Sequence, residues 1–167
     1  MSQGGRFRAV ASALLLALVI TPAALAQAVA TPTATPARVC ADAADMTAAH
    51  LYGLWQLSLW PLDGTQTTPA STGALLFERH PDYPGSVRGG IQRTAAGNDA
   101  QALVSGDVTD GEFNLDESTD GVTMDAVWNG TPQDCGQAIR GVRRPAEGRP
   151  ATEPAFNFLL IKTPGWR

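Results

Sequence analysis

The stretch LYGLWQLSLW, residues 51–60, places an apolar residue or a glycine at every second position. Alternate residues of an extended strand point to the same side of a sheet, so this pattern predicts a strand with one buried face. Pro61 cannot donate a ladder hydrogen bond and is expected to end the strand. The positions expected to share the buried face are Leu51, Gly53, Trp55, Leu57 and Leu59.

Seven further short segments repeat this period between turn-forming residues, and the chain carries no convincing amphipathic helix. The Asp-Gly pairs at 110–111 and 120–121 are the strongest hairpin signals. One short helical turn is expected within Ala41–His50, with Asp42 as its cap. The remaining expected strands are 73–79, 86–93, 101–108, 112–117, 122–128, 137–143 and 155–163.

These segments predict an all-β fold, an eight-stranded antiparallel up-and-down barrel. Short strands joined by sequential hairpins form meanders, and closing the sheet removes both of its exposed edges. A barrel of eight strands is either filled by its own side chains or holds one small ligand. In the sixth expected strand the inward positions are Val122, Met124, Ala126 and Trp128.

The N-terminal segment has the features of a secretory signal peptide. Arg6 and Arg8 precede an apolar run at 9–20, and the small-residue site Ala24-Leu25-Ala26 follows it. The run is shorter than the roughly 18 residues that a membrane span needs. We therefore expect residues 1–26 to be a signal peptide of a bacterial protein that is periplasmic or secreted, although a second cleavage site follows Ala30.

The part of the chain after the signal divides into two segments. Residues 27–39 are rich in Ala, Thr and Pro, which cannot bury a core, so they are expected to form a disordered tether. The barrel is expected to occupy residues 40–167 as one domain and one monomer. The formal net charge is −4 and becomes −6 without the signal, and Lys162 is the only lysine. This acidic balance argues against nucleic-acid binding.

The two cysteines, Cys40 and Cys135, both lie beyond the signal. In an oxidising compartment an even number of cysteines indicates a disulfide, and only one pairing is available. The pairing would join the start of the first strand to the approach of the seventh.

Gly53-Leu54-Trp55 near the start of the first strand and Lys162 late in the last strand resemble the motif of the calycin group, which includes lipocalins, fatty-acid-binding proteins and avidins. The resemblance implies that Trp55 closes one end of the barrel while the cation of Lys162 stacks on its ring. The residues that follow Trp55 depart from the polar set with which avidins hold biotin. The chain also resembles, more loosely, the small periplasmic inhibitors of metalloproteases, whose cysteines lie closer together in sequence.

Inward aromatic side chains are candidates for lining a ligand pocket, and the competing interpretation is an ordinary packed core. Arg140 and Arg143 differ by three positions and must face opposite sides of a strand, so one of them points into the barrel, where it would need a carboxylate partner or an anionic ligand. The candidate ligand-binding residues are Trp55, Phe77, Trp128, Arg140 and Phe158.

Charged residues are separated along the chain. Residues 107–125 hold seven acidic residues and no basic one, whereas residues 140–149 hold four arginines, and pairing across the sheet is the simplest expectation. Asp116, Ser118, Asp120 and Gly121 fit the start of a calcium loop, but its twelfth position is a valine where Glu is required. His50 and His80 are far apart in sequence, so no metal site and no cofactor are expected.

The chain contains no nucleophile motif, phosphate-binding loop or dinucleotide fingerprint, so a non-enzymatic role is expected. The first hypothesis is an exported binding protein that holds a small, partly apolar ligand inside the barrel. The alternative is a protein-binding module, for example an inhibitor of a secreted enzyme that acts through its loops or N-terminal segment.

Overall fold

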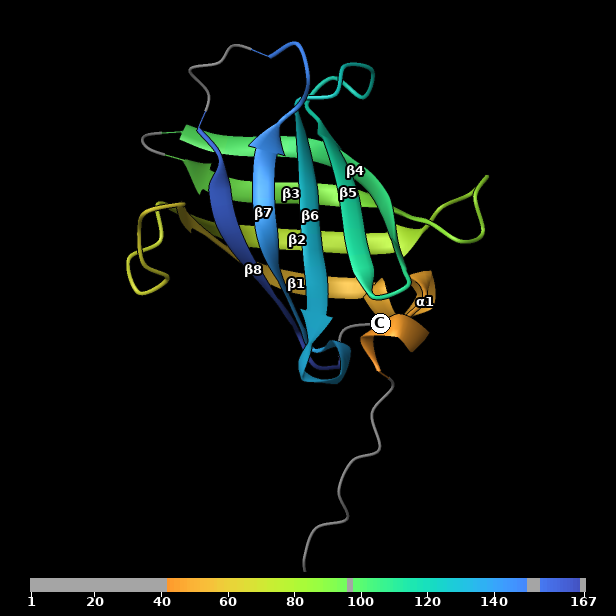
Figure 1. Ribbon diagram of the computed structural model, residues 1–167. Helices are drawn as coiled ribbons and strands as arrows, with labels where there is room; N and C mark the ends of the chain where they lie inside the picture. The colour runs from red at the N-terminus through yellow and green to blue at the C-terminus, as the bar shows by residue number, and fades with distance from the viewer. Residues whose placement is uncertain (1–41, 96–97, 150–153, 166–167) are drawn as a thin grey trace, which may run out of the picture. The chain divides into compact units, whose positions relative to one another are not determined.

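The computed structural model describes residues 42–95, 98–149 and 154–165. Eight antiparallel strands each pair with their sequence neighbours, and the last pairs with the first to close the barrel (Figure 1). The all-β up-and-down barrel expected from the sequence is therefore confirmed. The strands are β1 Gly53–Pro61, β2 Ser71–Arg79, β3 Val87–Ala95, β4 Asn98–Thr109, β5 Glu112–Ser118, β6 Ala126–Gln133, β7 Ala138–Pro145 and β8 Phe156–Lys162.

The two ends of the barrel differ. At the end where β1 begins, called here the helix end, lie the 3-10 turn η1 (Ala43–Asp45) and the short helix α1 (Ala48–Leu51). The opposite end, called here the loop end, carries the connections 62–70 and 119–125 and the residues 146–149 that follow β7. A second 3-10 turn, η2 (Asp134–Gly136), joins β6 to β7 at the helix end.

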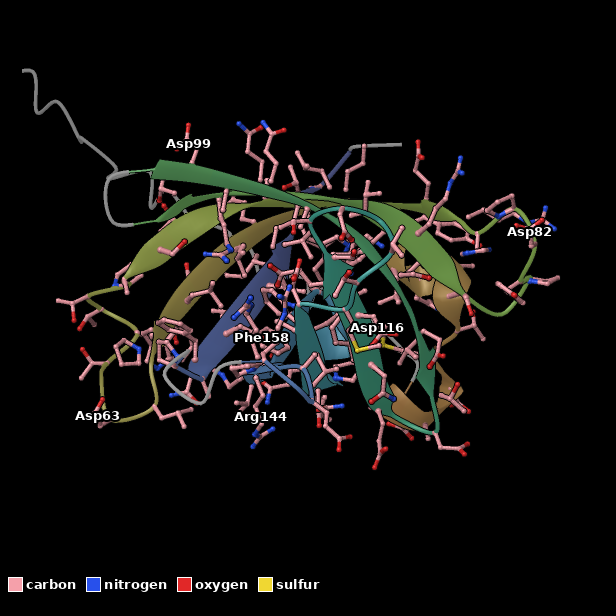
Figure 2. All side chains as sticks on the ribbon, turned by 90° about the horizontal axis from the view of Figure 1, so that it is seen from above. Asp63, Asp82, Asp99, Asp116, Arg144 and Phe158 are labelled. Atoms are coloured by element: carbon pink, nitrogen blue, oxygen red, sulfur yellow. The ribbon has the colours of Figure 1, made fainter. Side chains whose placement is uncertain are left out.

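Strict alternation along the strands separates the interior from the outer face. In β1, Trp55, Leu57 and Leu59 point inward and are at most 2% exposed, as the sequence predicts. Seen from above, Phe158 lies among the side chains that the strands enclose, whereas Asp63 and Asp82 lie on outer connections (Figure 2).

Several inward strand positions are glycines because the neighbouring strand leaves no room for a Cβ atom. A Cβ on Gly89 would overlap the carbonyl oxygen of Leu76, and one on Gly106 would overlap that of Asn114. Glycine at such positions lets strands bend sharply at the corners of a small barrel.

The sixth strand begins later than the sequence predicts, so the inward placement of Val122 and Met124 is wrong. Both side chains are exposed in the connection 119–125, at 90% and 44%. The cause is local: the Asp120 carboxylate accepts hydrogen bonds from the backbone N–H groups of Val122 and Thr123, which replaces strand pairing with a turn. Ala126 and Trp128 do point inward, and β6 continues to Gln133 through residues expected to form a turn.

The expected helical turn also differs in detail. Asp42 precedes η1 without a side-chain capping bond. Thr47 is the N-cap of α1, and Nδ1 of His50 accepts a hydrogen bond from the backbone N–H of Thr47 at 3.0 Å. The expected signal peptide, the tether and Cys40 lie outside the described residues, so the disulfide stays a prediction. Among the residues that are described, no helix is long and apolar enough to cross a membrane.

Candidate functional site

Trp55 closes the helix end of the barrel. Its ring is fully buried, and its indole N–H donates to the carbonyl oxygen of Leu51 at 2.7 Å. The Lys162 ammonium lies 5.4 Å from the centre of the Trp55 ring and donates to the carbonyl oxygen of His50. Partial burial holds the pKa of Lys162 below its usual value. Gly53 adopts φ 114°, a conformation that favours glycine. The arrangement is the one that the calycin resemblance implies.

A chain of aromatic rings fills the interior from that end. Phe77 lies 6.4 Å from Trp55 and 6.2 Å from Phe113, measured between ring centres. Phe158 lies 6.2 Å from Phe113 and 5.1 Å from Trp128. All four contacts are edge-to-face, the geometry that aromatic pairs prefer in a packed core. Four of the five candidate ligand residues therefore belong to this chain of rings, and each of the four is at most 1% exposed.

Phe113 is the member that the candidate list omitted. Its inward position follows from the alternation in the expected strand 112–117, so the signal was present in the sequence. What the sequence could not show is that Phe113 lies between Phe77 and Phe158 and links the two halves of the ring chain.

The inward arginine is Arg143, so the placement of Arg140 in a lumen site is wrong. In β7 the residues that share a face with Arg143 are Ile139 and Gly141, whereas Arg140 is exposed on the outer face. There the Arg140 guanidinium lies 5.4 Å from the centre of the Trp60 ring and donates to the side-chain oxygen of Gln66 at 2.7 Å.

Arg143 forms a buried ion pair with Glu117. Nε of Arg143 donates to Oε2 of Glu117 at 2.7 Å, and the Trp128 indole N–H donates to the same oxygen at 2.9 Å. A second guanidinium, that of Arg93, lies 3.6 Å from Oε1. Burial alone would raise the pKa of Glu117, but the hydrogen bonds and charge of Arg143 and the charge of Arg93 outweigh it and hold that pKa below its usual value.

Asp125 joins two connections at the loop end. Asp125 accepts hydrogen bonds from the backbone N–H and the hydroxyl of Thr119 at 2.6 and 2.7 Å, and it forms an ion pair with Arg149. The connection 119–125 is thereby fixed to the start of the connection after β7. Pairing of the arginine cluster with the acidic segment, expected from the sequence, is confirmed at Arg143 and Arg149.

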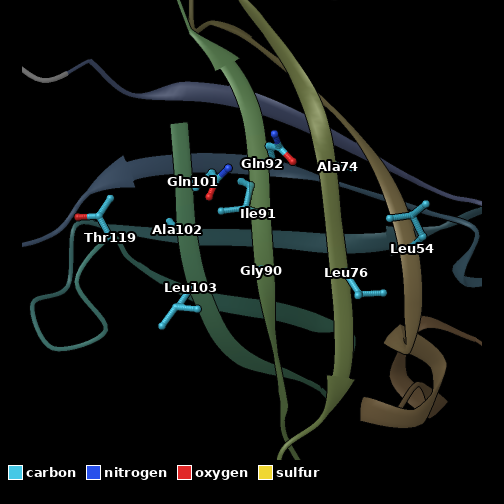
Figure 3. Close-up of a pocket in the computed structure, with 10 residues that line it drawn as sticks. All are labelled: Leu54, Ala74, Leu76, Gly90, Ile91, Gln92, Gln101, Ala102, Leu103 and Thr119. Atoms are coloured by element: carbon cyan, nitrogen blue, oxygen red, sulfur yellow. The ribbon is translucent and has the colours of Figure 1, made fainter. Parts of the chain in front are cut away.

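The outer face of β1–β4 carries a groove (Figure 3). One part of it has a volume of about 500 Å³ and runs from Leu54 across Leu76 and Gly90 to Leu103. A second part, of about 520 Å³, shares Leu76, Gly90 and Leu103 and continues toward β5. Its additional lining residues include Glu78, Arg88, Ser105, Asp116, Ser118 and Gly121.

Gly90 forms the floor of the groove, and the backbone does not require glycine there. A Cβ at this position would meet only the carbonyl oxygen of Ala102, at 3.9 Å, in ordinary contact. The neighbouring Gly89, which faces inward, has no such freedom. The groove exists because the residue between Leu76 and Leu103 in the strand register has no side chain.

Two carboxylates lie on the outer face beyond Leu103. Asp116 pairs in register with Ser105, and Asp107 pairs with Asn114, two positions further along the same strands. Burial, and next the charge of Asp107, raise the pKa of Asp116 above its usual value. Within the described ranges neither carboxylate has an ion-pair partner.

The remaining polar side chains considered in the sequence, His80 and Asp120, accept hydrogen bonds from backbone N–H groups close to them in the chain. Nδ1 of His80 accepts hydrogen bonds from the backbone N–H groups of Asp82 and Tyr83. Asp120, the middle of the calcium-like segment, is bound by the N–H groups described above, which lower its pKa. In the described part of the chain, no group of three or more His, Cys, Asp or Glu side chains could hold a metal ion.

Comparisons with known proteins give no family assignment. The chain matches no protein family model, and a search of curated proteins finds no match. The architecture and the geometry of the groove therefore carry the functional argument.

Proposed function

We propose that the protein is an exported, non-enzymatic binding protein that holds a polypeptide partner in the groove on the outer face of β1–β4. The observation that carries this proposal is the open floor at Gly90, flanked by exposed leucines, on a barrel whose interior is tightly packed. The barrel itself is compatible with either of the binding modes expected from the sequence.

The interior offers less support for a ligand than the outer face does. Pockets for small molecules usually have volumes of roughly 300–1,000 Å³. Two pockets of this size lie in the groove and a third lies on the outer face of β5–β7, whereas the interior positions that could line a lumen site pack against one another in the aromatic chain. The structure therefore favours the protein-binding alternative over the first hypothesis.

The groove is bordered by apolar side chains that water surrounds. Leu76 is 37% exposed and Leu103 is 58% exposed. The connection 119–125 lines the groove through Thr119 and Gly121, and it adds the exposed Val122 and Met124. Contiguous exposed apolar residues with polar borders are typical of protein–protein interaction sites.

A pair of glycine substitutions tests the groove. The purified protein is used to select from a phage-displayed library of 12-residue peptides, and the enriched peptides are titrated by fluorescence anisotropy. Gly90→Leu fills the groove, and we expect it to weaken binding at least tenfold. Gly85→Leu adds the same side chain where a Cβ meets nothing, in the connection between β2 and β3, and should leave binding unchanged.

Two results would overturn the proposal. One is that no peptide is enriched, or that both variants bind the peptides equally well. The other is that native mass spectrometry finds a small molecule retained by the wild-type protein and by Gly90→Leu alike, which would support the lumen hypothesis instead.

A further inference from the structure

The groove carries more carboxylates than cations. Glu78, Arg88 and Asp116 line it in one cross-strand row that runs through Ser105, so a single guanidinium stands between two carboxylates. Beyond Leu103 the groove reaches Asp116, with Asp107 beside it, and in the stretches that the structure describes no cation pairs with either.

Two neighbouring carboxylates without a cation repel each other, so a positive charge placed between them interacts favourably with both. The apolar floor and this carboxylate pair belong to one continuous surface, since Leu103, Gly90 and Asp116 all line the same part of the groove. A partner that uses the whole groove therefore meets an apolar site and an anionic site.

The spacing between the two sites follows from the strand register. Gly90 pairs with Leu103, and Leu103 pairs with Ser118, which lies two residues from Asp116 on β5. Two strand spacings and two residue rises place Asp116 about 12 Å from the floor. An extended peptide covers that distance in about three or four residues.

We propose that the groove recognises an extended polypeptide segment with an apolar side chain over Gly90 and a lysine or arginine three or four residues away that contacts Asp116 and Asp107. This inference rests on the proposed function and adds the chemistry of the partner. A second copy of the chain fits less well, because it would bring the same carboxylates and a net charge of −4 to an acidic surface.

The test uses the peptides enriched on the wild-type chain. Each is resynthesised with its basic residues replaced by glutamine, and both forms are titrated against the wild type, Asp116→Asn and Asp134→Asn. Asp134 lies on η2, between β6 and β7, and serves as the matched control. Exposed ion pairs contribute modestly, so Asp116→Asn should weaken binding of the basic form about three- to fivefold and leave the glutamine form unchanged.

The outcomes separate this inference from the proposed function. If Gly90→Leu weakens binding but Asp116→Asn does not, or if the enriched peptides carry no basic residue three or four positions from an apolar one, the charge inference is overturned while the groove stands. If neither variant weakens binding, both proposals fail. If both variants weaken it, and raising the salt concentration removes the effect of Asp116→Asn, both are supported.

Discussion

At the scale of single residues, Glu117 is the polar centre of the barrel. It is 2% exposed, yet its carboxylate is bound by Arg143 and Trp128 and faces Arg93. A buried charge is tolerated only when such partners compensate for the loss of water. The sequence predicts that one of Arg140 and Arg143 points inward and needs either a carboxylate or an anionic ligand, and the structure identifies the pair as Arg143 with Glu117.

Glu117→Gln should strongly destabilise the fold because it leaves Arg143 buried without a counter-charge. We expect a loss of about 3–5 kcal/mol in the free energy of unfolding, measured by urea denaturation at neutral pH. Glu112→Gln, an exposed change on the same strand, should cost less than about 0.5 kcal/mol. Equal losses for the two variants would contradict the assigned role of the ion pair.

The same pair predicts a dependence of stability on pH. The fold lowers the pKa of Glu117 from 4.5, so its stabilising contribution is complete above that pH and is lost as the pH falls through the folded-state pKa. The wild-type protein should therefore lose stability below about pH 4.5, and Glu117→Gln should lose less over the same interval. Parallel curves for the two proteins between pH 3 and 7 would show that other carboxylates control the acid transition.

At the scale of elements, β3 shows how alternation assigns two roles to adjacent glycines. Gly89 faces inward against β2, where only glycine fits, and Gly90 faces outward as the floor of the groove. Glycines inside a strand commonly mark sharp bends at barrel corners, which would explain both positions. That explanation holds for Gly89, but the open space above Gly90 shows that no bend requires glycine there.

Alanine at these two positions should have opposite effects. Gly89→Ala overlaps the backbone of Leu76 and should cost about 2–3 kcal/mol. Gly90→Ala meets no close atom and should be neutral or stabilise the protein by about 0.5–1 kcal/mol, because alanine loses less backbone freedom on folding. Thermal denaturation of both variants measures these effects. A destabilised Gly90→Ala would show that the conformation of β3 requires glycine at position 90, contrary to the prediction.

At the scale of the whole molecule, pairing of β8 with β1 places the first and the last strand of the barrel side by side. It brings Lys162 over Trp55, which are 107 positions apart in the sequence. The predicted disulfide would add a second long-range connection, from Cys40 to Cys135 near the same helix end.

Reduction should destabilise the protein if Cys40 and Cys135 are paired. Closing a loop of this length contributes about 4–5 kcal/mol in the chain-entropy description. The unreduced protein should resist alkylation in denaturant and take up two alkyl groups after reduction, which intact mass spectrometry measures. The double variant Cys40→Ser with Cys135→Ser should reproduce the stability of the reduced protein. Alkylation of both thiols without reduction would exclude the disulfide.

Local pattern alone determined the strand count, the antiparallel meander, the inward face of β1 and the pairing of the basic and acidic segments. These features depend on side-chain alternation and on turn-forming residues, both of which are local properties of the sequence. The beginning of β6 was missed because the Asp120 carboxylate binds nearby backbone N–H groups and turns an alternating segment into a loop.

Only the tertiary structure decided whether the inward aromatics line a cavity or pack together, since alternation is identical in both cases. The same is true of the choice between Arg140 and Arg143, which depends on register, and of the groove, which requires four strands and one unfilled position to meet. Which residues face inward follows largely from the spacing within a strand. Whether they leave a cavity depends on the total volume of side chains that strands far apart in the sequence place in the interior. No local sequence pattern gives that total.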